Sequence, residues 1–123
     1  MKKKILIYDD DVEILILCKA ILLKYDFDVE TLLICENILS DVEIIHPDII
    51  LMDLWIPKIG GEKAIEIIKQ NESSKQIPVV LFSANVNIKE ICKKVNADGY
   101  LEKPFSVSSF IEIIKRFTSE KAL

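Results

Sequence analysis

The sequence predicts an α/β fold in which helices cover both faces of a five-stranded parallel sheet. Short apolar segments alternate five times with segments whose apolar residues recur every three or four positions. This alternation is typical of strands joined by helical crossovers. Two of the short segments, 49–52 and 79–82, are apolar at every position. Strands of that kind are buried on both faces, so the sheet needs helices above and below it.

The first half of the chain is expected to form two strands, at 5–8 and 29–33, each followed by a helix. The first helix, 12–25, begins after three aspartates, and the spacing of Asp10 and Glu13 resembles a capping box. Its inner face is predicted to comprise Ile14, Leu17, Cys18, Ile21 and Tyr25. The second helix, 37–45, should turn Ile38, Val42 and Ile45 inward.

The central strand, 49–53, ends on Asp53 and runs into a turn that contains Pro57 and the pair Gly60-Gly61. A helix at 62–70 and a strand at 78–82, which ends on Ser83, are expected next. The spacing of Ile88, Ile91, Cys92 and Val95 predicts the fourth helix. Gly99 suits the position after that helix. A strand at 100–102 and a helix with an apolar stripe end the series; the stripe comprises Phe110, Ile113, Ile114 and Phe117.

Length and composition favour one domain over residues 1–123 and restrict its partners. The net charge of −4 argues against direct nucleic-acid binding, which needs a basic surface. No apolar run is long enough for a membrane span or a signal peptide. The three cysteines are widely spaced and form no metal-binding pair. We therefore expect a cytoplasmic protein with buried thiols.

Polar residues follow four of the five predicted strands. Asp9 and Asp10 follow the first, Asp53 ends the third, Ser83 ends the fourth and Lys103 follows the fifth. The carboxyl ends of parallel strands lie at one edge of a sheet, which is where open α/β sheets bind ligands. Three carboxylates, a hydroxyl and an ammonium are therefore expected to converge.

Three neighbouring carboxylates repel one another, and a hard divalent cation removes that conflict. Mg²⁺ is the expected cofactor, with Mn²⁺ as a substitute. A carboxylate beside the metal could act as a nucleophile toward a phosphoryl group, which the lysine and the hydroxyl would also contact. Plainer interpretations exist: Asp53 could cap a turn, the acidic run could be solvated, and Ser83 and Lys103 could simply end strands. The single histidine, His46, has no partner ligands and is interpreted as a surface residue.

Four segments in order resemble a receiver domain of the two-component response regulators, and the resemblance covers essentially the whole chain. Segment 5–10 resembles the family's first strand and its acidic pair, and 47–53 with Pro57 and Gly61 resembles the phosphoacceptor segment. Segments 77–84 and 99–105 resemble the strand with the switch hydroxyl and the last strand with its lysine-proline pair. The resemblance implies a flavodoxin-like, three-layer α/β/α fold with strand order 2-1-3-4-5.

The resemblance also implies the roles of the site residues. Asp53 would accept a phosphoryl group from a phosphohistidine on a histidine kinase or a histidine phosphotransfer protein. Asp10 would bind Mg²⁺ directly and Asp9 mainly through water, while the backbone carbonyl of Trp55 would complete the protein's share of the metal ligands. Lys103 would pair with a phosphoryl oxygen.

The expected output is a two-state switch. Ser83 would turn to hydrogen-bond the phosphoryl group, and Tyr100 would follow it inward. This would change the face formed by the fourth helix, fifth strand and fifth helix, and so control a partner or a missing output domain. The peptide between Lys103 and Pro104 is expected to be cis. Tyr100 could equally be purely structural, since strands favour aromatic residues.

Two other functions remain open. A pseudo-receiver would use its last face constitutively, without phosphorylation. An enzyme acting on small molecules would need a phosphate-binding Gly-rich loop after the first strand, and the sequence has none there. The protein is therefore expected to catalyse no reaction other than its own phosphorylation and dephosphorylation. It could also dimerise when phosphorylated. Trp55 departs from the small or polar residue that the family often has there.

Overall fold

The computed structural model describes residues 2–119 and contains all five strands and five helices that the sequence predicts. The elements are β1 (Lys4–Tyr8), α1 (Val12–Lys24), β2 (Asp28–Leu32), α2 (Ile38–Ile45), β3 (Ile49–Asp53), α3 (Gly61–Gln70), β4 (Val79–Ser83), α4 (Ile88–Val95), β5 (Gly99–Glu102) and α5 (Val107–Thr118). For each element whose first and last residues were predicted from the sequence, the observed ends differ from the predicted ones by no more than two residues.

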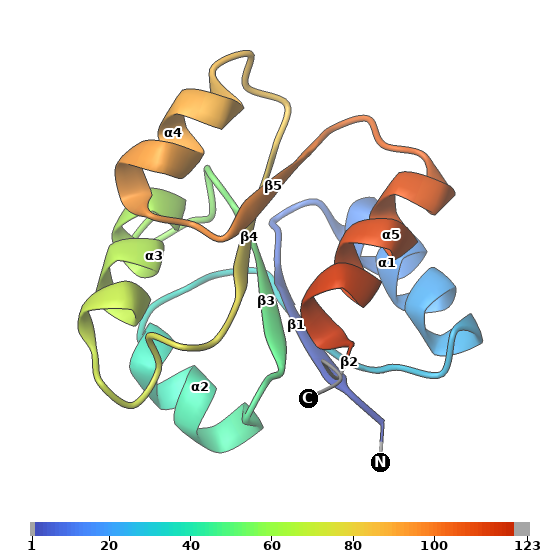
Figure 1. The fold of residues 1–123 in the computed structure, drawn as a ribbon, viewed down its shortest axis with the longest axis horizontal. Coiled ribbons are helices and arrows are strands. Elements are labelled where there is room, and N and C mark those ends of the chain that lie inside the picture. Colours follow the sequence, from blue (N-terminus) through green and yellow to red (C-terminus); the bar gives the residue numbers. More distant parts are fainter. Residues whose placement is uncertain (1, 120–123) are drawn as a thin grey trace.

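The strands form one parallel sheet in the order β2-β1-β3-β4-β5. Helices α2, α3 and α4 lie on one face, and α1 and α5 lie on the other (Figure 1). This arrangement confirms the predicted three-layer, doubly wound fold. All crossovers run from the carboxyl end of one strand back to the amino end of the next, so the five carboxyl ends share one edge.

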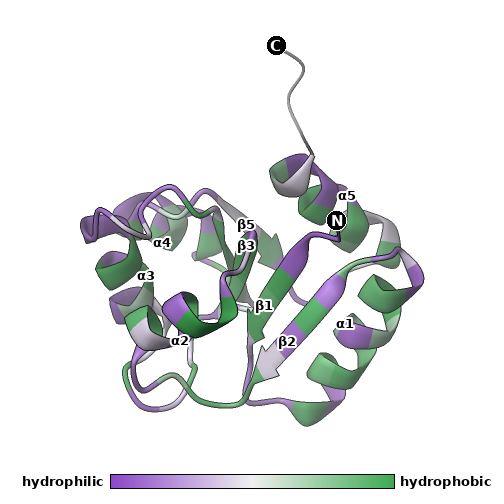
Figure 2. Cartoon of the chain, turned by 90° about the horizontal axis from the view of Figure 1, so that it is seen from below, coloured by the Kyte–Doolittle hydropathy of each residue, from purple (hydrophilic) through white to green (hydrophobic). Residues whose placement is uncertain are grey.

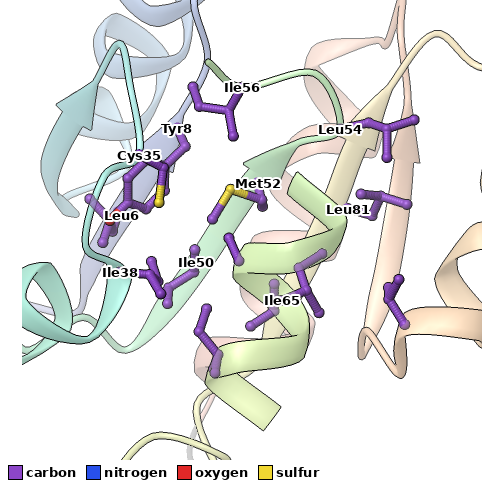
Figure 3. Packing of buried hydrophobic residues seen from close by; sticks show 14 of the residues in the cluster. Leu6, Tyr8, Cys35, Ile38, Ile50, Met52, Leu54, Ile56, Ile65 and Leu81 are labelled. Atoms are coloured by element: carbon purple, nitrogen blue, oxygen red, sulfur yellow. The ribbon is translucent and has the colours of Figure 1, made fainter. Parts of the chain in front are cut away.

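Two hydrophobic clusters fill the space between the layers, because alternate residues of a strand point to opposite faces. Leu6, Ile50 and Leu81 pack against α2, α3 and α4, as Figure 3 shows for part of this cluster. Their neighbours along the strands, such as Ile7 and Leu51, pack against α1 and α5. Strands β3 and β4 are buried at every position, as their uniformly apolar sequences predict.

Strand β2 forms one edge of the sheet and is paired only with β1 among the described residues. Its side chains are half-buried or exposed, and its acidic residues Asp28 and Glu30 are exposed. Strand β5 forms the opposite edge and is four residues long.

The inner face of helix α1 is only partly the one predicted: Cys18 is buried and Ile14 and Ile21 pack against the core, but Leu17 and Tyr25 do not face inward. Leu15, Cys18 and Leu22 are buried, whereas Leu17 and Tyr25 are 49% and 45% exposed. Hydrophobic residues occur on several sides of this helix (Figure 2), so their spacing alone does not define the inner face. The face is set instead by the position of the helix over β1 and β3.

Two helix ends, the start of α1 and the end of α4, were predicted with unequal success. Asp11, for which capping or solvation is the expected role, is the N-cap of α1, and the capping box suggested by Asp10 and Glu13 does not form: an Asp11 carboxylate oxygen accepts hydrogen bonds from the amides of Glu13, at 3.0 Å, and Ile14, at 3.4 Å. Helix α4 ends at Asn96, which adopts the left-handed conformation with φ of 67°. Gly99 instead begins β5, close to the ring of Phe117.

His46 is exposed, as predicted, and ends α2 in the left-handed conformation. No helix among residues 2–119 is long and apolar enough to cross a membrane. The three cysteines are free and buried, as predicted.

Gly61 lies where the chain leaves β3 and enters α3. A β-carbon at this position would come within 2.8 Å of the Leu54 α-carbon and would also collide with the Asp53 carbonyl oxygen. Both of these atoms belong to the backbone, so they cannot move aside without displacing the segment that contains Asp53. Gly60, by contrast, has open space around it and a φ of +81°.

We expect Gly61→Ala to destabilise the protein by several kcal/mol, because the added methyl group collides with backbone. Gly60→Ala is the matched control, since it causes no collision and introduces only the backbone strain of an alanine at φ of 81° and ψ of 154°, roughly 1–3 kcal/mol. Urea unfolding followed by circular dichroism measures both. Equal losses for the two variants would contradict the close packing at Gly61.

Candidate functional site

The carboxyl ends of the strands enclose a pocket of about 440 Å³. Asp9 follows β1, Asp53 ends β3, Ser83 ends β4 and Lys103 follows β5, so four separate strands supply its polar side chains. The lining residues are Asp9, Asp10, Asp11, Asp53, Trp55, Ser83, Ala84, Asn85 and Lys103. Six of these nine residues were predicted from the sequence as site residues; Asp11, Ala84 and Asn85 are additional.

The Lys103 ammonium joins two carboxylates at the centre of this pocket. Its Nζ lies 2.5 Å from an Asp9 oxygen and 3.0 Å from an Asp53 oxygen. Asp9 is only 1% exposed and Asp53 5% exposed. The Phe82 ring lies beneath the ammonium, with its centroid 4.5 Å from Nζ. A buried lysine held between two buried carboxylates is therefore the electrostatic centre of the site.

Burial and neighbouring charges shift the pKa values of Asp53 and Lys103. Burial raises the pKa of Asp53, the hydrogen bond and charge of Lys103 oppose that rise, and the charges of Asp9 and Asp10 add to it. Burial alone would lower the pKa of Lys103, but its hydrogen bonds to Asp9 and Asp53 outweigh that effect and raise it. Lys103 is therefore a permanent cation, and negative charge on Asp53 is costly without further compensation.

The carboxylates of Asp9, Asp10 and Asp53 differ in how many hydrogen bonds they accept from the protein. One Asp9 oxygen accepts the Asp11 amide at 2.9 Å, and the other accepts Lys103. One Asp53 oxygen accepts Lys103. Asp10 is exposed and accepts no hydrogen bond from residues 2–119. One oxygen from each of Asp9, Asp10 and Asp53 falls within a group whose members are at most 4.8 Å apart, a spacing that suits one cation.

Ser83 and Tyr100 lie on the two strands that border α4. Ser83 is buried, and its hydroxyl oxygen accepts the Asn85 amide at 3.1 Å, which stabilises the turn after β4. The Ser83 carbonyl accepts the Lys103 amide at 2.9 Å. Tyr100 is half-buried on β5 and lines a separate pocket of about 520 Å³ between α4 and α5. The peptide between Lys103 and Pro104 is cis, as expected.

Trp55 lies at the mouth of the pocket, and its side chain is 70% exposed. It belongs to the loop 54–60 between β3 and α3. The carbonyls of Asp53 and Leu54 accept the amides of Ile56 and Gly61. The Trp55 carbonyl accepts no such bond within the described part of the chain, so its lone pairs remain available to a ligand.

Replacing Asp53 with Asn should stabilise the metal-free protein at neutral pH, because it removes a buried charge. Since the pKa of Asp53 is raised on folding, the folded state binds its proton more tightly. Wild-type stability therefore falls as the pH rises from the unfolded pKa through the folded pKa, and the full penalty is present above both. Asparagine has no such penalty.

Urea midpoints in EDTA measure this difference, with Glu30→Gln, on the exposed face of edge strand β2, as the control that should leave the midpoint unchanged. The advantage of Asp53→Asn should be present at pH 7 and absent near pH 3, roughly below both pKa values. An Asp53→Asn variant that is less stable than wild type at pH 7 would contradict the cost assigned to this carboxylate.

Known proteins of similar sequence are response regulators. The chain is 34% identical over 77 residues to the polar-differentiation response regulator DivK of Brucella species; the match covers 61% of this chain and 63% of DivK. It therefore spans less than two thirds of those relatives. The chain is also 31% identical over 114 residues to protein PilG of Pseudomonas aeruginosa, covering 91% of this chain and 84% of PilG.

Solved structures share the fold over nearly the whole chain. A response regulator of Chloroflexus aurantiacus superimposes with a TM-score of 0.90 at 21% identity, covering 98% of this chain and 100% of that one. The receiver domain of the sensor histidine kinase PA1611 of Pseudomonas aeruginosa has a magnesium ion in its active-site cleft. It superimposes with a TM-score of 0.87 at 24% identity, with 98% and 100% coverage.

The family model of the response regulator receiver domain matches residues 5–115, which include every residue of the pocket described above. This match agrees with the strand order and with the relatives of similar sequence. The chain therefore belongs to the response regulator receiver domain family, whose members are signalling modules of two-component systems.

Proposed function

We propose that this receiver domain is a phosphorylated switch in which Asp53 accepts a phosphoryl group from a phosphohistidine. The observation that supports this most strongly is the buried Asp53 carboxylate held by Lys103 beside two further aspartates. An Asp53 oxygen would form the new P–O bond while the P–N bond to the donor imidazole breaks, and the imidazole regains a proton. The product is an acyl phosphate on Asp53.

The donor set fits a magnesium ion. It consists only of oxygens, which Mg²⁺ prefers, and it combines the Asp10 carboxylate, which accepts no hydrogen bond from residues 2–119, with the available Trp55 carbonyl. Asp10, Asp53 and the Trp55 carbonyl would bind the metal directly, because their oxygens are the least occupied by protein donors. Asp9, with both oxygens engaged, would act mainly through water. When bound, the metal supplies positive charge to the phosphoryl oxygens. Mn²⁺ has similar ligand preferences and should substitute.

Lys103 is suited to bind a phosphoryl oxygen, since it is a cation already in contact with the attacking carboxylate. Ser83 ends the neighbouring strand, and its hydroxyl proton is available to the phosphoryl group, since the Asn85 amide uses only the oxygen's acceptor capacity. A movement of Ser83 would open space beside β5 for Tyr100, which lines the pocket between α4 and α5. The α4-β5-α5 face would then differ between the two states.

The partners that we propose are a histidine kinase or histidine phosphotransfer protein and a downstream protein target or output domain. Exposed apolar side chains at the carboxyl edge of the sheet support docking of a protein over the site, because such residues mark interaction surfaces when they cluster. They are Val12 and Ile16 on α1, Leu33 and Ile34 after β2, Trp55 after β3 and Val86 after β4. We propose residues 1–123 as one receiver unit and leave dimerisation on phosphorylation to measurement.

The proposed function is tested by incubating the protein with Mg²⁺ and acetyl phosphate or phosphoramidate and recording its intact mass. Wild type should gain one phosphoryl group only when the metal is present, because the metal and Lys103 together offset the charge on the transferred group. Asp53→Asn should gain none. Asp48→Asn, which changes an exposed carboxylate at the opposite edge of the sheet, is the matched control and should behave as wild type.

An adduct that persists in Asp53→Asn would contradict the assignment of the acceptor. Wild type that remains unmodified, and that also fails to bind beryllofluoride, would favour a constitutive pseudo-receiver. The beryllofluoride measurement is needed because a short-lived phosphorylated form would escape detection by mass.

Trp55→Asn should shorten the lifetime of the phosphorylated form several-fold. The indole lies at the pocket mouth and would limit the approach of water to the acyl phosphate, whereas asparagine is smaller and can hydrogen-bond that water. The decay of phosphorylated protein after removal of the donor measures the rate, and Trp55→Phe, which keeps an aromatic cover, should decay like wild type. An unchanged rate in Trp55→Asn would contradict this role.

A further inference from the structure

Tyr8 is a large residue whose polar hydroxyl lies within the hydrophobic cluster at the end of β1. It is the last residue of β1, fully buried, and directly precedes Asp9. Its hydroxyl donates a hydrogen bond of 2.6 Å to a carboxylate oxygen of Asp41, in the first turn of α2. A buried tyrosine hydroxyl needs such a partner, so this bond ties the strand that leads into the acidic site to a helix on the other side of the hydrophobic cluster.

The Cys35 side chain completes this group. Cys35 is fully buried and lies beside Tyr8 within the cluster (Figure 3). Burial, the Asp41 hydrogen bond and the nearby Cys35 all raise the pKa of Tyr8, and burial raises the pKa of Cys35 to about 12. Tyr8 and Cys35 are therefore neutral at physiological pH. We call Tyr8, Cys35 and Asp41 the Tyr8 cluster.

The backbone of Cys35 connects this cluster to the loop that contains Trp55. The Cys35 amide donates to the Pro57 carbonyl at 3.1 Å, and the Ile59 amide donates to the Cys35 carbonyl at 3.1 Å. These bonds form an isolated parallel bridge between Cys35 and Lys58, and Lys58 has a positive φ of 85°. The loop 54–60 is thus held from both sides of one residue whose side chain is anchored in the core.

We propose that the Tyr8 cluster positions the loop 54–60 and thereby holds the Trp55 carbonyl toward the acidic pocket. Tyr8, Cys35 and Asp41 are positioning residues, since they line no part of that pocket. The chain of contacts runs from Asp41 to Tyr8, from Tyr8 to Cys35 and from Cys35 to Pro57 and Ile59. The part of this inference that concerns metal binding rests on the proposed function; the part that concerns the loop does not.

Trp55 can serve as a fluorescent reporter of the loop, and Ser74 provides a matched control. Trp55 is the only tryptophan in the sequence, so its fluorescence reports on the loop alone. Ser74 is another fully buried hydroxyl, which donates to the Ile68 carbonyl at 2.8 Å in the turn between α3 and β4, at the opposite edge of the sheet. Tyr8→Phe and Ser74→Ala each remove one buried hydrogen bond, and both should lower the Tm by a few degrees.

Only Tyr8→Phe should change the fluorescence of Trp55. In EDTA, the Trp55 anisotropy of this variant should be lower, and the quenching of Trp55 by acrylamide should be stronger, than in wild type or in Ser74→Ala. The Mg²⁺ dissociation constant of Tyr8→Phe, measured by titration of the same signal, should be raised about tenfold, which is at the lower end of losses caused by removing supports of metal ligands.

Variants of Asp41 test the same hydrogen bond from its other end. Asp41→Asn keeps an acceptor for the Tyr8 hydroxyl and should retain the wild-type Trp55 signal, whereas Asp41→Leu should behave like Tyr8→Phe. The double variant Tyr8→Phe/Asp41→Leu should lose no more Trp55 anisotropy than either single variant, because each substitution removes the same hydrogen bond between Tyr8 and Asp41.

Equal Trp55 anisotropy and quenching in Tyr8→Phe, Ser74→Ala and wild type would overturn the proposal. A changed Trp55 signal in metal-free Tyr8→Phe supports positioning of the loop even if wild-type protein binds no Mg²⁺ and accepts no phosphoryl group. Failure of the proposed function and failure of this inference are therefore distinguishable.

Discussion

The contact of Lys103 with Asp9 and Asp53 is the interaction on which the carboxyl edge of this sheet depends. It joins residues 94 and 50 positions apart in the sequence and brings the ends of β1, β3 and β5 together. Without the lysine, two nearly buried carboxylates would face each other with no compensating charge. One cation between two anions still leaves a net negative charge, which is the electrostatic condition that favours a second, divalent cation.

The charge of Asp53 lowers the stability of the metal-free protein and at the same time favours metal binding. Burial and neighbouring carboxylates make the charge of Asp53 unfavourable in the metal-free fold. A carboxylate in that condition gains more from metal binding than a solvated one would. The protein thus retains a locally unfavourable group at the point where chemistry is proposed, and the hydrophobic clusters on both faces of the sheet provide the stability that permits it.

Much of the fold was predictable because its signals are local. The uniformly apolar β3 and β4, the helical spacing in α4, and the polar residue at each strand end follow from a few adjacent residues, and parallel topology then places those ends together. The inner face of α1 was predicted only in part, with Leu17 and Tyr25 chosen in place of Leu15 and Leu22, because apolar residues surround that helix. The roles of Asp53, Lys103 and Ser83 came from a resemblance to a family, since strand ends alone also admit plain structural interpretations.

Other features depend on contacts that sequence spacing does not encode. The Tyr8 hydroxyl meets Asp41, 33 residues away, and Cys35 pairs with the loop beyond Trp55. An unusually large polar residue at a buried strand end was the available signal for the first contact. The cap of α1 was ambiguous among three consecutive aspartates, and only the path of the backbone selects Asp11.

The composition of the outer strands also bears on edge-to-edge aggregation. A parallel sheet that does not close on itself leaves unpaired backbone groups at both margins, which are templates for cross-chain strand addition and fibril formation. Here β2 presents Asp28 and Glu30 at that margin, and β5 is four residues long. An incoming copy of β2 aligned in register would bring identical carboxylates together, so the charges that contribute nothing to the core protect a very hydrophobic chain from aggregation.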